Sequence, residues 1–364
     1  MGLQLVNIDK TVDQELHLGD VSLTLESGRR YIILGRTLAG KTSLLRVMAG
    51  LDRPSAGTVH VDGRNVTGVS VRKRDVAMVY QQFINYPSLT IYQNIASPLR
   101  IAGVKRDEID RRVCAVAGAL RLDPLLDRLP AELSGGQQQR TAIARALVKE
   151  SHLLLLDEPL VNLDYKLREE LREELQTIFE ARDSIVVYTT TEPLEALMLG
   201  GNVVVMDEGR VLQVGETAEV FHNPVSTKVA EVFSDPPINF IRGRVDSEAV
   251  RLGRDMILEP SRARGFQGLL PGEYIFGVRS SRLFLDRRTE GDAEFRGEVE
   301  LTEINGSETF IHVAYGDTNL VVQEDGVRTR KAGMNLSVFV DPGDFYVFDV
   351  DGRLLFSPAG RKQG

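Results

Sequence analysis

The sequence has little that would suit an extracellular, membrane-spanning or nucleic-acid-binding protein. Its one cysteine, Cys114, excludes an intrachain disulfide and favours a reducing compartment. No apolar run approaches the roughly 20 residues that a membrane-spanning helix needs. The first residues, MGLQLVNIDK, lack the order of charged, apolar and small residues that marks a signal peptide. We therefore expect a cytosolic protein that can still dock on a membrane partner.

A basic excess is also missing. The 364 residues include 44 Lys and Arg against 52 Asp and Glu, which gives a formal net charge of −8. General nucleic-acid binders usually carry a basic face, so we expect no nucleic-acid partner. The composition, 42% apolar and 26% charged, is that of an ordinary globular protein, and the length allows two or three domains with full-sized cores.

Strand and helix patterns alternate from the N-terminus to about residue 235. RYIILG, HLLLLDEP and SIVVYTT have the pattern of short buried strands, while KTSLLRVMAGL and YKLREELREELQTIFEA have helical spacing. This alternation predicts an α/β domain over residues 1–235, with a mostly parallel sheet covered by helices. Strand patterns are absent between about residues 88 and 137, where we expect an inserted helical subdomain.

The pattern changes after SDPPINF. Short alternating strands with glycine turns follow, as in EYIFGVRSSRLFL and ETFIHVAYG, and they predict an all-β domain over residues 236–364, a small OB-like Greek-key barrel. The DPP segment, Asp235 to Pro237, has the composition of a hinge.

The strongest local motif is GRTLAGKTS, which fits G-x-x-x-x-G-K-[ST] and lies between a predicted strand and a predicted helix. Such a loop aims backbone N–H groups at phosphate oxygens beside a helix N-terminus. Lys41 would reach the β- and γ-phosphates of ATP, and the Thr42 hydroxyl would bind Mg²⁺. An ordinary glycine turn is the weaker alternative in this context. The predicted cofactor-binding residues of the loop are Gly35, Arg36, Thr37, Leu38, Ala39, Gly40, Lys41, Thr42 and Ser43.

A pair of acids follows the apolar strand HLLLL. Asp157 and Glu158 emerge at the carboxyl end of this strand, where ligands bind in open α/β sheets. Asp157 can hold Mg²⁺ through water, and Glu158 can polarise an attacking water. Alone, such a pair is often a helix cap or a solvated edge. The phosphate loop upstream favours the nucleotide interpretation.

The segment LSGGQQQRTAIARAL begins at Leu133. Ser134 is suited to cap a helix, and Gly135 and Gly136 leave the backbone bare, so this is a second helix N-terminus that can face an anion. By itself it could be only a good cap. Together with the phosphate loop, LSGGQ resembles the signature of the ATPase subunits of ABC transporters.

This resemblance implies a head-to-tail dimer in which each ATP lies between one subunit's phosphate loop and the signature of the other. Ser134, Gly135, Gly136 and Gln137 would then face the partner's ATP. Gln81, in VYQQF, matches the glutamine loop, which contacts Mg²⁺ and relays to the membrane subunits. The resemblance thus implies a magnesium site formed by Thr42, Gln81 and Asp157. VNLD, Val161 to Asp164, occupies the next family loop, where serine is usual in place of Val161.

Further segments resemble the carbohydrate-importer subfamily, among them NYPSLTIYQNIASPLR and, in the tail, PPINFIRGRV and EVELTEINGSETFIHV. The resemblance implies a peripheral protein on the cytoplasmic face of the membrane, with two transmembrane permease subunits and a solute-binding protein as partners. The tail would be a regulatory domain, and the solute a sugar, a polyol or a glycerol-type compound. A non-transport ATPase of this superfamily, or a regulatory subunit in which ATP is a structural ligand, is the alternative.

The chain departs from the family at its own half-site. In TTTEPLEAL, Thr191 stands at the position of a histidine that contacts the γ-phosphate and the attacking water, and threonine cannot relay a proton near neutral pH. Arg36 and Ala39 also differ from the common loop residues. Val12 is the nearest match to an adenine-stacking aromatic, and His17 looks poorly placed for that role.

The signature and Glu158 are intact, which leads to a hypothesis about the dimer. In an asymmetric heterodimer this chain would hydrolyse ATP slowly in its own half-site and complete a more active site on a second ATPase subunit. A homodimer in which Thr191, Glu158 and Lys41 suffice is the competing hypothesis.

Overall fold

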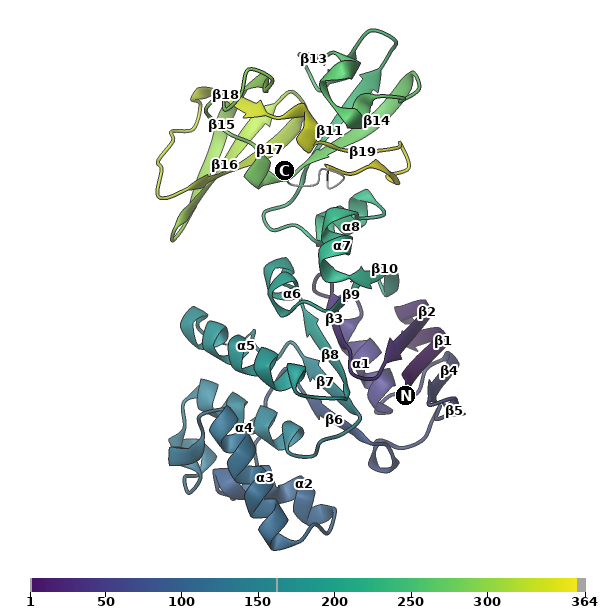
Figure 1. The fold of residues 1–364 in the computed structure, drawn as a ribbon, viewed down its shortest axis with the longest axis vertical. Helices are drawn as coiled ribbons and strands as arrows, with labels where there is room; N and C mark the ends of the chain where they lie inside the picture. Colours follow the sequence, from purple (N-terminus) through teal and green to yellow (C-terminus); the bar gives the residue numbers. More distant parts are fainter. Residues whose placement is uncertain (1, 162, 359–364) are drawn as a thin grey trace. The chain divides into compact units, whose positions relative to one another are not determined.

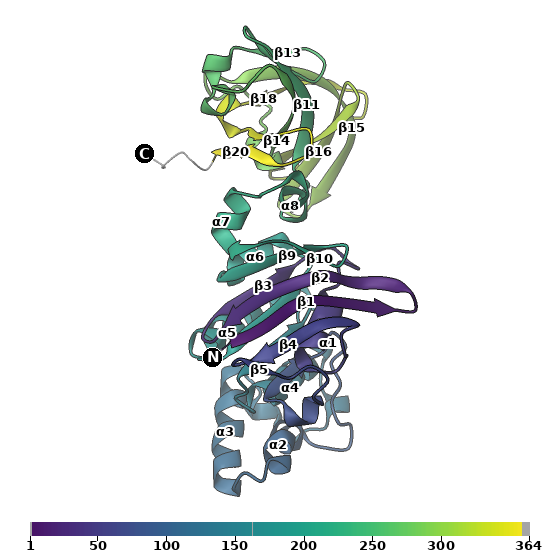
Figure 2. The same ribbon diagram turned by 90° about the vertical axis from the view of Figure 1, so that its right-hand side faces the viewer.

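The computed structural model describes residues 2–161 and 163–358, which form two compact units, 1–217 and 218–364. The first unit is a mixed α/β structure and the second consists mainly of strands (Figures 1 and 2). The predicted fold class is therefore confirmed. The contacts divide the chain after Thr217, whereas the boundary at residue 235, taken from the change in sequence pattern, stays a prediction.

A six-stranded sheet is the centre of the first unit, with strand order β10-β9-β3-β8-β7-β6. All neighbouring strands in it run parallel except β10, which pairs antiparallel with β9. Its strands are β3 (Arg30–Leu34), β6 (Val76–Val79), β7 (Leu153–Asp157), β8 (Ile185–Thr190), β9 (Asn202–Asp207) and β10 (Arg210–Glu216). β7 and β8 are buried along their whole length because helices and neighbouring strands cover both faces.

An antiparallel sheet packs against this centre, with order β2-β1-β4-β5. Its strands are β1 (Gly2–Val12), β2 (Glu15–Glu26), β4 (Ala56–Val61) and β5 (Arg64–Asn65). Helix α1 (Lys41–Ala49) lies between the two sheets (Figure 1), and its Leu44 and Leu45 are fully buried in a core shared with both. Burial of this apolar stripe fixes the direction of α1, and with it the position of the loop before it.

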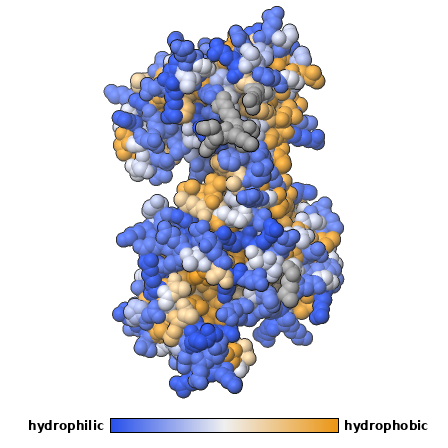
Figure 3. Space-filling model, viewed as in Figure 1, coloured by the Kyte–Doolittle hydropathy of each residue, from blue (hydrophilic) through white to orange (hydrophobic). Residues whose placement is uncertain are grey.

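Helices α2 (Ile91–Ile101), α3 (Arg106–Ala119) and α4 (Gly135–Leu147) lie together in the helical region predicted at about residues 88–137, although α4 continues to Leu147 (Figure 1). α5 (Tyr165–Glu180) and α6 (Pro193–Leu199) follow β7 and β8. Across residues 2–161 and 163–358, no helix is both long and apolar enough to cross a membrane. The face seen in Figure 3 is mostly hydrophilic, with scattered hydrophobic patches.

The second unit begins with two short helices, α7 (Thr217–His222) and α8 (Thr227–Val232). Two antiparallel sheets follow, with orders β13-β12-β11-β14-β19-β20 and β17-β16-β15-β18. The strands are β11 (Asn239–Val245), β12 (Val250–Leu252), β13 (Met256–Leu258), β14 (Gly272–Val278), β15 (Ala293–Asn305), β16 (Glu308–Tyr315), β17 (Thr318–Asp325), β18 (Asn335–Val340), β19 (Tyr346–Phe348) and β20 (Leu354–Phe356). Their alternating side chains share one apolar core.

Tyr315 joins the two sheets of this unit. Its side chain is 1% exposed, and its hydroxyl donates to Asp255 Oδ1 at 2.7 Å while it accepts from the backbone N–H of Met256 at 3.1 Å.

We predict that Tyr315→Phe lowers the free energy of unfolding by about 1–3 kcal/mol, because buried polar groups lose their partner. Chemical denaturation of the full chain measures this change. Tyr274→Phe is the control, since the Tyr274 hydroxyl is exposed and donates to the carbonyl oxygen of Leu270 at 2.9 Å. An equal loss in both variants would contradict the prediction.

Candidate functional site

The candidate site lies where β3, β7 and β8 end. Because these strands are parallel neighbours, their carboxyl ends reach one edge of the sheet. β3 leads into the loop before α1, β7 ends at Asp157, and β8 ends at Thr190. Three segments far apart in the sequence therefore supply one site.

The loop between β3 and α1 depends on close backbone approach. Gly40 has φ +95°, and a Cβ there would lie 2.6 Å from the carbonyl oxygen of His17. A Cβ on Gly35 would lie 2.5 Å from the carbonyl oxygen of Met206. Neither position accepts a side chain without movement of the backbone, so the two glycines of the motif are required by the fold. Arg36, Thr37 and Leu38, between them, are exposed, and Ala39 is buried.

Lys41 is held by the loop that precedes it. Its side chain is 5% exposed, and Nζ donates to the carbonyl oxygens of Gly35 at 2.8 Å and Arg36 at 3.0 Å. Nζ also lies 3.1 Å from Glu158 Oε1. The ammonium group thus joins the loop to the end of β7, in the place where the sequence motif predicts phosphate.

Asp157 is a buried carboxylate with two hydroxyl donors. It is 3% exposed, and Oδ1 accepts from Thr189 Oγ1 at 2.9 Å and from Thr42 Oγ1 at 3.1 Å. Burial raises the pKa of Asp157, and the two hydroxyl bonds partly offset this by stabilising the charged form. Thr42 and Asp157, two of the residues predicted to hold Mg²⁺, are in direct contact, and the magnesium site itself stays a prediction.

Glu158 has an unusual backbone conformation for a non-glycine residue, with φ +42°. Its backbone N–H donates to Thr189 Oγ1 at 2.9 Å. Its carboxylate, paired with Lys41, also accepts from Gln81 Nε2 at 3.3 Å. The structure therefore brings together Lys41, Thr42, Gln81, Asp157 and Glu158. Ser43, next in α1, lies at the same end of the helix.

Thr191 follows β8 directly and is half-buried. Within residues 2–161 and 163–358, its hydroxyl has no hydrogen-bond partner. The neighbouring Glu192 forms an ion pair with Arg168, and its backbone N–H donates to Thr190 Oγ1 at 3.0 Å. The position where a histidine was expected thus carries a hydroxyl that the described part of the chain does not engage.

The predicted signature is at the N-terminus of α4, among the helices of the inserted region and apart from α1 (Figure 1). Ser134 caps this helix as expected: its Oγ accepts from the Gln137 N–H at 3.4 Å, and Gln137 Oε1 accepts from the Ser134 N–H at 3.0 Å. A Cβ on Gly135 would meet open space, whereas Gly136 packs against Leu163 and Leu167. This surface is therefore separate from the phosphate loop of the same chain.

Two residues near the site have no role in the sequence interpretation. Thr189 hydrogen-bonds to both members of the acid pair. The parallel register of β7 and β8, which places it directly beside Asp157, is the feature that could have identified it. His17, which looked poorly placed, lies beside the loop, with Nδ1 3.1 Å from Ser43 Oγ.

Val12 ends β1 and is exposed. Of the loop VNLD, Asp164 caps α5, and Asn162 lies outside the described residues.

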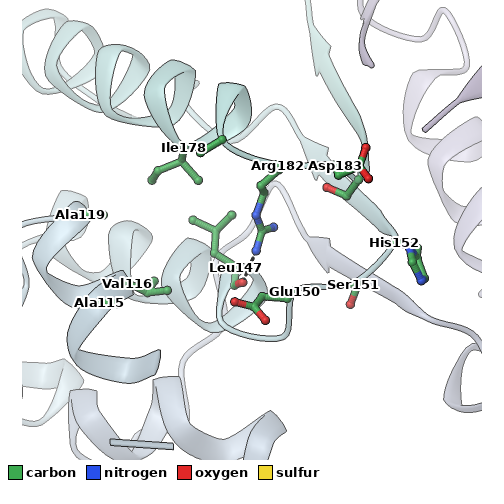
Figure 4. A pocket seen from close by; sticks show the side chains of 12 residues that line it. Ala115, Val116, Ala119, Leu147, Glu150, Ser151, His152, Ile178, Arg182 and Asp183 are labelled. Atoms are coloured by element: carbon green, nitrogen blue, oxygen red, sulfur yellow. Dashed lines mark hydrogen bonds between the residues drawn. The ribbon is translucent and has the colours of Figure 1, made fainter. Parts of the chain in front are cut away.

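A cavity of about 510 Å³ lies at the other ends of the strands (Figure 4). Its lining comes from α3, from the ends of α4 and α5, and from the segments before β7 and β8. Arg182 extends into it and donates to the carbonyl oxygen of Leu147. Because these residues precede the strands, the cavity is distinct from the candidate site.

A loop that is bounded by two glycines at a helix N-terminus, together with a buried lysine and an acid pair, defines a phosphate-loop ATPase site.

The ABC transporter family model matches residues 18–161. The trehalose/maltose import ATP-binding protein MalK of Thermococcus litoralis is 36% identical over 98% of this chain and 100% of its own length. The sn-glycerol-3-phosphate import ATP-binding protein UgpC of Brucella abortus is 35% identical over 92% of this chain and 93% of its own.

A solved structure of a dimeric ATP-binding cassette in a post-hydrolysis state, bound to ADP and phosphate, is similar with a TM-score of 0.54 and 28% identity. The match covers 59% of this chain and 98% of that one. The chain therefore belongs to the ABC transporter family, as one of its ATP-binding subunits, and it is an ATPase coupled to transport.

A buried acid in α6, the helix that follows β8, makes stability depend on pH. Glu195 is 7% exposed and accepts from the hydroxyl of Tyr188 at 2.7 Å. Burial raises the pKa of Glu195 above its ordinary value of 4.5, although hydrogen bonds from Thr190 and Tyr188 oppose the rise. The folded chain thus binds this proton more tightly than the unfolded chain does. Ionisation of Glu195 therefore makes the free energy of unfolding fall as the pH rises from about 4.5 through the raised pKa.

We predict that Glu195→Gln, which keeps an acceptor for Tyr188 but has no charge, removes this part of the pH dependence. Relative to the unchanged chain, its free energy of unfolding should increase between pH 4.5 and pH 8. Chemical denaturation across this range measures the difference. Glu192→Gln is the control, because Glu192 is more exposed and pairs with Arg168. If the free energy of unfolding changes with pH in the same way for Glu195→Gln and the unchanged chain, the prediction is wrong.

Proposed function

We propose that this ATPase powers the import of a sugar, polyol or glycerol-type solute. The names of its relatives, which import trehalose, maltose and glycerol 3-phosphate, support this solute class. The observation that carries the proposal is the meeting of Lys41, Thr42, Asp157 and Glu158 at one edge of the sheet. In this proposal two permease subunits and a solute-binding protein complete the transporter, and the chain is peripheral on the cytoplasmic face of the membrane.

Mg²⁺ accompanies ATP in the proposed site. The residues present fit it, since a hydroxyl from Thr42, a carboxylate from Asp157 and an amide oxygen from Gln81 are the hard oxygen donors that Mg²⁺ prefers. No group of three or more His, Cys, Asp or Glu able to hold a metal occurs in the described part of the chain. This agrees with a metal that takes much of its coordination from phosphate and water. Mg²⁺ neutralises charge on the phosphates when bound.

The residues of the chain have distinct tasks in the proposed reaction. Backbone N–H groups at the start of α1 and Lys41 Nζ bind the β- and γ-phosphates, so Lys41 exchanges its contact with Glu158 for phosphate oxygens. Glu158, released from Lys41, accepts a hydrogen bond from the attacking water and takes its proton. Water adds to the γ-phosphorus while the bond to the β-phosphate oxygen breaks, which yields ADP and phosphate. Thr191 can orient a phosphate oxygen or water but cannot carry positive charge.

We infer that the working unit is an asymmetric heterodimer, with a homodimer as the second candidate. Thr191 weakens the half-site built on the chain's own Lys41. The N-terminus of α4, from Ser134 to Gln137, keeps its capping box and its open backbone for the ATP of a partner. In this arrangement the partner's phosphate loop forms the faster site.

The all-β part of the chain, which we place at residues 236–364 after a nucleotide-binding domain of residues 1–235, is proposed to regulate transport. Its support is the separate core of this unit, which gives the strands a stable fold that the ATPase chemistry does not require.

The half-site hypothesis predicts different results for two substitutions. In the assembled transporter, Ser134→Ala should lower ATP turnover more than Glu158→Gln does, since Ser134 serves the faster site and Glu158 the slower one. In the chain alone, Glu158→Gln should abolish the residual turnover and leave ATP binding intact, because the amide cannot take the proton. Steady-state phosphate release and ATP titration measure both effects. If Glu158→Gln costs as much as Ser134→Ala in the assembly, the asymmetry is wrong.

Restoring the histidine tests the same hypothesis by gain of function. Thr191→His should raise turnover of the chain's own half-site by about tenfold or more, since proton relays of this kind contribute about 10²–10⁴-fold in enzymes. The measurement compares phosphate release by the unchanged chain and the variant, each alone and with the candidate partner. Thr191→Asn is the matched control, because it hydrogen-bonds without relaying a proton. Full turnover by the lone unchanged chain, insensitive to residue 191, would sink the heterodimer proposal.

A further inference from the structure

Thr189 has a buried hydroxyl in a strand that is otherwise packed largely by apolar side chains. It is the fifth residue of β8, is fully buried, and follows the apolar run Ile185–Val187. Threonine and valine have nearly the same shape, but a buried hydroxyl is costly unless it is hydrogen-bonded. Here the hydroxyl uses both of its functions: it donates to Asp157 Oδ1 at 2.9 Å and accepts from the Glu158 N–H at 2.9 Å.

These two bonds fix the point where β7 ends. The parallel register pairs Asp157 with Thr189, so the hydroxyl lies beside the acid pair without reaching across the sheet. Asp157 Oδ1 is held from one side by Thr189 and from the other by Thr42, which begins α1 with Lys41. The same hydroxyl satisfies the backbone N–H of Glu158, whose φ of +42° is a conformation that needs support from its surroundings.

The neighbouring threonine shows that this arrangement is specific to Thr189. Thr190 is 3% exposed, but its hydroxyl accepts from the Glu192 N–H at 3.0 Å, away from the acid pair. One strand thus carries two buried hydroxyls with separate partners, and only the first contacts Asp157 and Glu158 among the described residues.

We propose that Thr189 is a positioning residue of the ATPase site, which holds Asp157 for Mg²⁺ and Glu158 for the attacking water. This inference rests on the proposed roles of the two acids. Without the Thr189 hydroxyl, Asp157 Oδ1 loses one of the two hydroxyl donors it has among the described residues, and the partly buried Glu158 N–H loses its acceptor. Glu158 then leaves its left-handed conformation more easily, and its carboxylate samples positions away from Lys41 and Gln81.

The test compares Thr189→Val, Thr189→Ser and Thr190→Val in the full chain. In Thr189→Val, the backbone amide of Glu158 should exchange with deuterium on the order of tenfold faster or more, because its acceptor is gone. ATP turnover should fall by about tenfold to hundredfold, as is usual when a group that orients a metal ligand is removed, with little change in KM for ATP. The Mg²⁺ concentration that gives half-maximal ATP binding should rise. Thr189→Ser should restore all three quantities, and Thr190→Val should leave the Glu158 amide and the Mg²⁺ dependence unchanged.

Each outcome distinguishes a positioning role of the Thr189 hydroxyl from a packing role of its side chain. Equal exchange of the Glu158 amide in Thr189→Val and the unchanged chain, or an equal Mg²⁺ requirement, would overturn the inference. Failure of Thr189→Ser to rescue would do the same, because it would assign the effect to the missing methyl group. If the unchanged chain shows no turnover alone or assembled, the proposed function fails, and the amide exchange and Mg²⁺-dependent ATP binding still decide the role of Thr189.

Discussion

One carboxylate oxygen, Asp157 Oδ1, connects the parts of the ATPase site. It accepts hydroxyl hydrogens from Thr42, in the first turn of α1, and from Thr189, near the end of β8, while Asp157 itself ends β7. A carboxylate that is 3% exposed is stable only with such donors, because the loss of water around a charge is costly. The need to satisfy this one group therefore fixes the helix N-terminus and two strand ends relative to each other.

Backbone contacts fix the position of the phosphate loop on the other side of the site. Gly35 and Gly40 lie too close to the carbonyl oxygens of Met206 and His17 for any side chain, so the loop packs directly on β9 and β2. Lys41 then points back into its own loop and reaches Glu158 at 3.1 Å. The lysine and the acid stabilise each other electrostatically, and phosphate competes for the lysine with the same kind of interaction. The site is thus organised by the fold, and in the proposed reaction the phosphate of ATP replaces Glu158 as the counter-ion of Lys41.

The sequence alone predicts those parts of the site that depend on short motifs. The loop from Gly35 to Ser43, the acids after β7 and the cap at Ser134 need only local spacing and local propensities, and each occurs where it was expected. Thr189 was missed because its contacts with the acid pair come from strand register, which no local pattern encodes. The contact of His17 with Ser43 likewise depends on the packing of β2 on α1. The helix expected after the Ser134 cap is also present, as α4 from Gly135 to Leu147.

The N-terminus of α4 and the end of β8 are two separate surfaces of the chain. The capping box of Ser134 and Gln137 is closed within the first turn of α4, and Gly136 packs on Leu163 and Leu167, so the signature takes no support from β8. The Thr191 hydroxyl has no hydrogen-bond partner within the described residues. Sites without shared partners change independently of each other. In the proposed heterodimer, a change at residue 191 would therefore affect the half-site built on the chain's own lysine and leave the N-terminus of α4 unchanged.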